Sequence, residues 1–208
     1  NHISELLGKL NNDFKDKIIV TGSLKIDNLI NEYKNFKKIS HNKRRVITLF
    51  SFYHSYLLQD ITYRLGKWSP DYSFGFCKLF DSVHQVVAKY ALENSNVDIF
   101  IKLKWQDNLW KKYILSALKK INIDPKNIKN LKFVDNISAQ KLIFNSDTVI
   151  AFNSSVLTES LLLNKKTIIP IYFEAEDKYS DYVLWKDKDI FNKVYSEDDL
   201  YKEIKIFQ

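Results

Sequence analysis

The stretch 148–170 holds the residues best suited to chemistry. A short apolar run ends in three polar residues, Asn153, Ser154 and Ser155, and a leucine-rich helical segment follows directly. The start of a helix exposes backbone N–H groups and the positive end of the helix dipole, so it is a natural seat for a phosphate. If the chain binds a nucleotide, we expect it to bind here. The alternative is that the serines only cap the helix, as serine often does.

Thr158 and Glu159 stand one turn into the same helical segment. A carboxylate at this position could merely complement the helix dipole. If Glu159 faces a crevice instead, it could accept hydrogen bonds from both hydroxyls of a ribose, and such charge-assisted bonds are strong. Both interpretations fit the sequence.

Two lysines, Lys102 and Lys104, fall at the end of an alternating strand pattern and share one of its faces. A lysine that pointed into the core would be costly unless it were paired. The two side chains therefore lie either on a solvent-exposed face or beside phosphate or carboxylate oxygens.

Short apolar strands alternate with helices along the chain, which is typical of βαβ units around a parallel sheet. We expect an α/β fold with a Rossmann-like, doubly wound parallel sheet and helices on both faces. The predicted strands are 17–21, 45–51, 98–105, 131–134, 148–152 and 167–173. The predicted helices are 24–36, one from 76, one from 107, one near 138, 155–163 and one from 196. Asn164 is expected to end its helix in a left-handed conformation.

Such sheets bind ligands at the carboxyl ends of their strands, where the strand order reverses. The polar residues after the predicted strands, with Thr158 and Glu159 in the following helix, form the candidate ligand site. These candidates are Gly22, Ser23, Ser51, Lys102, Lys104, Asn136, Asn153, Ser154, Ser155, Thr158 and Glu159.

We expect one domain over 1–208, with the aromatic-rich stretch 53–75 as an insertion. Long connections inside compact domains are often lids or binding loops. The alternative is an interface with a part of the protein outside this chain. No methionine is present, so we expect a longer protein or a processed one.

The formal charge of +7 and the isoelectric point near 9.2 favour anionic partners. The densest basic cluster, 37–45, is either a plain exposed loop or a basic rim that touches phosphates or the inner face of a membrane. Cys77 and His84 lie in one predicted helix, Cys77 as a buried inert thiol and His84 off the apolar stripe, at the surface. A single cysteine excludes an intrachain disulfide and indicates a cytoplasmic protein.

Several other chemistries lack their motifs. With four glycines, the chain has neither a Walker loop nor a Gly-x-Gly-x-x-Gly fingerprint, and it has no Gly-x-Ser-x-Gly elbow. Its four histidines show no metal spacing, so neither a metal nor a cofactor is expected. No apolar run approaches a membrane span, and no signal peptide is recognisable.

Three segments resemble a known family. Residues 21–27, Thr-Gly-Ser-Leu-Lys-Ile-Asp, look like the Thr-Gly-Asn-Pro-Arg-x-Asp element of GT-B glycosyltransferases of bacterial capsule and lipopolysaccharide biosynthesis. Residues 101–104 resemble their Ile-Lys-Pro-Lys/His strand end, with Leu103 in place of proline. Residues 149–170 are similar to their Phe-Asn-Ser-Thr-x-Leu-x-Glu-Ala-Leu region, although 164–166 replace its Gly-Lys-Pro. The serine pair is also similar to the donor-phosphate motif of sialyltransferases.

The resemblance, which spans about 17–206, implies the donor-binding, C-terminal half of a two-domain enzyme. It implies a CMP- or UDP-linked sugar as donor and a surface polysaccharide or glycolipid as acceptor. The phosphate would lie at 153–155, the ribose at Glu159 and the base near 134–136, while Lys102 or Lys104 would neutralise the leaving nucleotide. The catalytic base would lie in the other half, so the catalytic residues are unknown.

Three alternatives stay open. A sugar-nucleotide epimerase or a polyol-phosphate transferase would share the architecture. A non-catalytic module could instead bind a glycan or a nucleotide. A nucleic-acid partner is not expected, because most aromatic residues fall on apolar helix stripes.

Overall fold

The computed structural model describes residues 24–36, 44–52, 75–104 and 108–206. The chain divides into two compact units, Asn1–Asn35 and Phe36–Gln208. The smaller unit is described only by helix α2 (Leu24–Asn35), which confirms the helix predicted at 24–36. The predicted strand 17–21, Gly22, Ser23 and nearly all of the aromatic stretch lie outside the described residues. The expectation of a single domain stays a prediction.

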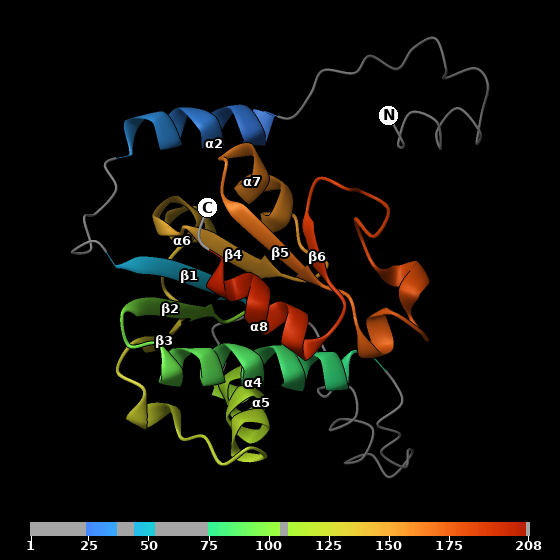
Figure 1. Cartoon of the computed structure of the whole chain (residues 1–208). Helices are drawn as coiled ribbons and strands as arrows, with labels where there is room; N and C mark the ends of the chain where they lie inside the picture. The colour runs from blue at the N-terminus through green and yellow to red at the C-terminus, as the bar shows by residue number, and fades with distance from the viewer. Residues whose placement is uncertain (1–23, 37–43, 53–74, 105–107, 207–208) are drawn as a thin grey trace. The chain divides into compact units, whose positions relative to one another are not determined.

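The larger unit is built on a six-stranded sheet in which every pairing is parallel (Figure 1). Its strand order is β3-β2-β1-β4-β5-β6. The strands are β1 (Arg45–Phe50), β2 (Val97–Lys102), β3 (Leu131–Val134), β4 (Thr148–Ala151), β5 (Lys166–Pro170) and β6 (Asn192–Val194). This is a Rossmann-like, doubly wound sheet, as predicted. Strand β6 was not predicted, because three residues with two half-exposed side chains give no periodic signal.

Helices cover both faces of this sheet (Figure 1). Helices α4 (Cys77–Glu93), α5 (Asn108–Lys119) and α8 (Glu197–Lys205) lie on one face. Helices α6 (Ala139–Asn145) and α7 (Val156–Leu162) lie on the other. Short 3₁₀ turns occupy η2 (Pro125–Asn127), η3 (Phe173–Ala175) and η4 (Ser180–Tyr182). No helix in the described ranges is long and apolar enough to span a membrane.

Local capping explains where several helices begin and end. The Ser138 hydroxyl accepts a hydrogen bond from the Lys141 N–H, and the Ser196 hydroxyl accepts one from the Asp199 N–H. Both are N-caps that satisfy exposed N–H groups of the first turn. Asn164 has a φ of 56°, the left-handed conformation predicted for it at the end of α7. Cys77 is buried, as expected.

The core is deepest around β1, which has a strand on each side and five buried residues in succession after Arg45. A strand with this pattern is buried on both faces, as in other parallel sheets. The two ends of β1 have different surroundings. Arg44 pairs with Asp98 at 3.2 Å, and Arg45 donates to the carbonyl oxygens of the last residue of α8 and of the residue after it, so both arginines of the basic cluster are engaged at the amino edge. The carboxyl end enters the candidate site.

Candidate functional site

The carboxyl ends of the four strands β3, β2, β1 and β4 lie at the same level along the edge of the sheet. The ladder register places Lys102 opposite both Val134 and Phe50, and Phe50 opposite Ala151. The chain moves outward from β1 to β2 and β3, then returns across β1 to β4. The reversal of strand order therefore lies between β1 and β4, which is where sheets of this kind bind ligands.

The polar residues that follow these strands consequently share one edge. Asn136 follows β3, Lys104 follows β2, and Asn153 and Ser154 follow β4. The predicted convergence is present in the fold, and the contacts within it show how each side chain is held. Whether they bind a ligand stays a prediction.

The turn between β4 and α7 carries the two serines. The Ser154 Oγ accepts a hydrogen bond from the Val156 N–H at 3.3 Å, and the Ser155 hydroxyl donates to the Glu159 carboxylate at 3.3 Å. Ser154 is half-buried and Ser155 is exposed, so neither is sealed in the core. Ser155 is the N-cap residue of α7, and the Ser154 oxygen lies in the turn at the sheet edge, held by the first N–H of the helix.

Glu159 is 6% exposed and lies directly behind this turn. Burying a carboxylate is costly unless hydrogen bonds compensate, and the Ser155 hydroxyl supplies one. Next to it, the Thr158 Oγ1 is buried and has no hydrogen-bond partner within the described ranges. Buried polar atoms are normally satisfied, so this hydroxyl is an exception in the first turns of α7.

Lys102 lies on the less buried face of β2, and Lys104 follows two residues after the strand ends. The Lys102 Nζ donates to the Asp135 carbonyl, so its side chain turns toward β3 and away from β4. Lys104 is exposed. Asn136 is also exposed and lies one residue beyond that carbonyl. The ammonium groups of Lys102 and Lys104 therefore lie at the carboxyl edge of the sheet, outside the core.

Asn153 has a role that the sequence did not reveal. Its backbone takes a positive φ of 47°, and its side chain spans to the segment after β5. The Asn153 Nδ2 donates to the Tyr182 carbonyl at 2.9 Å, and the Leu184 N–H donates to the Asn153 Oδ1 at 2.8 Å. Both ends of the amide are used, so Asn153 fastens this segment to the candidate site.

Ser51 is buried, and two side chains hold its hydroxyl. The Trp110 Nε1–H donates to the Ser51 Oγ at 2.8 Å, and the His84 Nε2 lies 3.1 Å from the same oxygen. The His84 Nδ1 lies 2.7 Å from the Phe80 carbonyl, which can only accept, so Nδ1 carries the proton. The Ser51 hydroxyl therefore donates to Nε2, and the chain of bonds joins β1 to α4 and α5.

The prediction that His84 lies at the surface is wrong, because its side chain is 0% exposed. The apolar stripe of α4 marks only part of its buried surface, since the helix contacts α5, α8 and η3 as well as the sheet. Desolvation lowers the pKa of His84 to about 4, so the ring is neutral at pH 7.

An aromatic layer lies next to the point where strand order reverses. Phe52 follows β1 and Phe152 follows β4, and their ring centroids are 5.1 Å apart. Phe76 packs edge-on against Phe152 at 4.8 Å. Phe52 and Phe152 are buried, so the edge has an apolar floor under its polar residues. The sequence signal for Phe52 and Phe152 was that each lies within two residues of the end of a buried strand, and Phe76 directly precedes helix α4.

Within the described part of the chain, no group of three His, Cys, Asp or Glu side chains could hold a metal ion.

The sheet order and the two helical layers define a Rossmann-like domain. The fold is similar to UDP-GlcNAc 2-epimerase from Neisseria meningitidis bound to UDP-GlcNAc, with a TM-score of 0.53 and 14% identity over 91% of this chain and 46% of that one. It is also similar to ADP-heptose lipopolysaccharide heptosyltransferase II from E. coli, with a TM-score of 0.46 and 9% identity over 89% of this chain and 51% of that one. A β-Kdo 2,4 transferase from Thermosulfurimonas dismutans has a TM-score of 0.41 and 11% sequence identity, over 88% of this chain and 56% of that one.

At these identities the likeness concerns the fold alone. The chain spans about half the length of each of these structures. No protein-family model matches the sequence. No curated protein matches it either.

Proposed function

We propose that this chain is the donor-binding half of a glycosyltransferase. It would take a sugar from a CMP- or UDP-linked donor and serve transfer to a surface polysaccharide or glycolipid. The observation that carries this proposal is the β4–α7 turn at the strand-order reversal. There, two accessible serines stand in front of a buried glutamate.

The donor would lie along the carboxyl edge. Its phosphate would contact Ser154 and Ser155, its ribose Glu159, and its base the end of β3 near Asn136. From β4 to β3 is three strand spacings of about 4.8 Å, or roughly 14 Å, a span that a nucleoside diphosphate can cover. Lys102 or Lys104, midway along this edge, would stabilise the negative charge of the departing nucleotide.

The remaining candidates have supporting roles in this proposal. Ser51 positions the end of β1 through its bonds to His84 and Trp110, and Asn153 positions the segment that follows β5. Gly22 and Ser23 stay predicted donor contacts. Because a catalytic base would come from the other half of the enzyme, we expect this chain alone to bind nucleotide weakly and to transfer nothing.

Thermal unfolding of the chain with a panel of nucleoside mono- and diphosphates tests the proposal. A nucleotide at ten times its Kd should raise Tm by about 3–6 °C. The Ser154→Ala/Glu159→Ala variant should lose this rise, whereas a matched variant at exposed positions, Ser116→Ala/Glu176→Ala, should keep it. A panel in which no nucleotide shifts Tm would contradict the proposal.

A sugar-nucleotide epimerase is the second candidate, because the epimerase structure above has the same fold and carries a nucleotide sugar. Product analysis with the longer protein separates the two. Transfer yields a free nucleotide and a glycosylated acceptor, while epimerisation to a new nucleotide sugar without acceptor would favour the epimerase. A polyol-phosphate transferase would leave a phosphodiester in the product. Nucleotide binding without any turnover would favour a non-catalytic module.

A further inference from the structure

The outer edge of the sheet carries nearly all of the net charge of the chain. Residues 108–133 contain seven lysines and a single acidic residue, Asp124, which makes a formal charge of +6 against +7 for the whole sequence. This stretch forms α5, η2 and the edge strand β3, which are contiguous in space (Figure 1).

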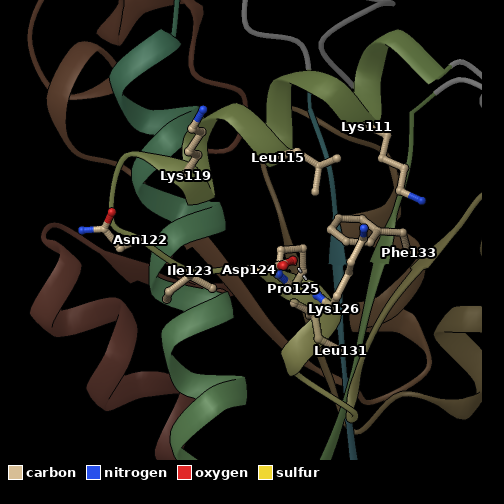
Figure 2. A pocket seen from close by; sticks show the side chains of 10 residues that line it. All are labelled: Lys111, Leu115, Lys119, Asn122, Ile123, Asp124, Pro125, Lys126, Leu131 and Phe133. Atoms are coloured by element: carbon tan, nitrogen blue, oxygen red, sulfur yellow. Dashed lines mark hydrogen bonds between the residues drawn. The ribbon is translucent and has the colours of Figure 1, made fainter.

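A hollow of about 720 Å³ lies in this edge, between α5, the turn before η2, and β3 (Figure 2). Its floor is apolar and includes Leu115, which is 36% exposed, and the ring of Phe133. Three exposed lysines, Lys111, Lys119 and Lys126, stand around it. The volume lies within the range of about 300–1,000 Å³ usual for small-molecule sites.

The charges around this hollow are not balanced internally. Among the described residues that line it, Asp124 is the one acidic residue, and its carboxylate accepts a hydrogen bond from the Lys126 N–H at 3.0 Å as the cap of η2. The Lys111 Nζ lies 5.5 Å from the centroid of the Phe133 ring, so a cation borders the apolar floor directly. Such a site suits a ligand that has both an anionic group and an apolar body.

We propose that this hollow, lined by Lys111, Leu115, Lys119, Lys126 and Phe133, binds an anionic phospholipid at a membrane surface. The headgroup phosphate would meet the lysines, and the start of an acyl chain would cover the apolar floor. Lysines at an anionic surface each contribute to binding, and a basic helix that also exposes a leucine has the character of an interfacial element.

Other anionic partners fit less well. Single-stranded nucleic acid is held by stacking of bases on exposed aromatic rings, and Phe133, the one aromatic ring among the described lining residues, is half-buried and has Lys111 beside it. A free phosphate or nucleotide would leave the apolar floor uncovered. The proposal is independent of the donor site, and it places a membrane contact at a surface other than 37–45.

Vesicle sedimentation of the 208-residue chain tests the proposed binding of an anionic phospholipid. We expect binding to vesicles that contain phosphatidylglycerol and none to vesicles of phosphatidylcholine alone, with weakening at high salt. Lys111→Glu/Lys119→Glu/Lys126→Glu should lower the partition coefficient at least 100-fold, since each lysine contributes about fivefold. Circular dichroism and Tm verify that the variant is folded.

A matched triple variant separates a site from overall charge. Lys89→Glu/Lys141→Glu/Lys202→Glu changes the charge equally at exposed positions of other helices, and should reduce binding far less. An equal loss in both triple variants would overturn the proposal. So would equal binding to both vesicle types, or no binding to either.

The apolar floor has its own test. Leu115→Ser removes part of it without changing charge, and should weaken vesicle binding most at high salt, where the electrostatic contribution is small. Unchanged binding of this variant would refute the proposed pocket. Tight binding of single-stranded RNA that the lysine variant loses, while vesicle binding survives, would assign the edge to nucleic acid.

Discussion

A neutral histidine holds the end of the central strand. His84, Ser51 and Trp110 come from three different elements, and each hydrogen bond in their chain has a defined donor. Buried polar networks are stable when every member is satisfied, and they orient the groups they contain. At this site the network positions the carboxyl end of β1 beside the proposed ligand edge.

This burial predicts a pH dependence of stability. As pH falls through about 6.5, His84 of the unfolded chain gains a proton, while the folded chain keeps it neutral until a pH of about 4. The free energy of unfolding should therefore decrease across this window, by up to about 3 kcal/mol from this residue. Urea unfolding at several pH values should show that His84→Gln lacks this part of the dependence.

Trp110→Phe is the matched control. It removes one hydrogen bond to Ser51 and leaves His84 in place, so its stability should still fall with acidification as in the wild type. An identical pH profile for His84→Gln and the wild type would contradict the prediction.

The segment that follows β5 is fastened to other elements by a few side chains. Glu174 accepts hydrogen bonds from the Lys78 and Leu79 N–H groups at 2.9 and 3.0 Å, so a residue from a distant part of the sequence caps the start of α4. Tyr172 reaches the Ser82 hydroxyl at 3.1 Å, and burial raises the pKa of Tyr172. Asn153 ties the later part of the segment to β4.

Glu174→Ala should lower the free energy of unfolding by about 2 kcal/mol, because it leaves two N–H groups at a helix start without their acceptor. Glu176→Ala removes the same charge from an exposed position two residues away, and should change stability by less than about 0.5 kcal/mol. Equal effects of the two substitutions in chemical denaturation would show that Glu174 does not act as a cap.

The end of α7 gives a second test at this scale. Asn164 adopts a φ of 56°, where an ordinary side chain is strained by roughly 1 kcal/mol and glycine is not. Asn164→Ala should therefore destabilise the chain by about that amount, whereas Asn164→Gly should be close to neutral. A glycine variant as unstable as the alanine variant would argue that the asparagine side chain matters more than its backbone.

In the molecule as a whole, the two proposed sites use different residues of the fold, although strand β3 borders both of them. The donor edge centres on the β4–α7 turn, and the basic hollow lies between α5 and β3. Since no residue of the hollow is a proposed donor contact, ligands of the two sites should act on separate parts of the chain.

Hydrogen exchange can resolve the two sites. A nucleotide should slow exchange at 151–159 and near Asn136, because a bound ligand suppresses local opening around it, and should leave 108–126 unchanged. Anionic vesicles should slow exchange at 108–126 and leave 151–159 and the region near Asn136 unchanged. Protection of α5 by the nucleotide would place the donor elsewhere than we propose.

The sequence by itself determined the alternation of strands and helices, the helix starts near Ser138 and Ser196, and the left-handed Asn164. These features depend on periodicity and on contacts within a few residues, so they are visible locally. Only the tertiary structure decided the strand order, the short β6, the burial of His84 and the fastening role of Asn153. Ser51 meets partners 33 and 59 residues away, and Asn153 meets partners 29 and 31 residues away. A side chain whose environment comes from such distant segments carries no local pattern that could reveal it.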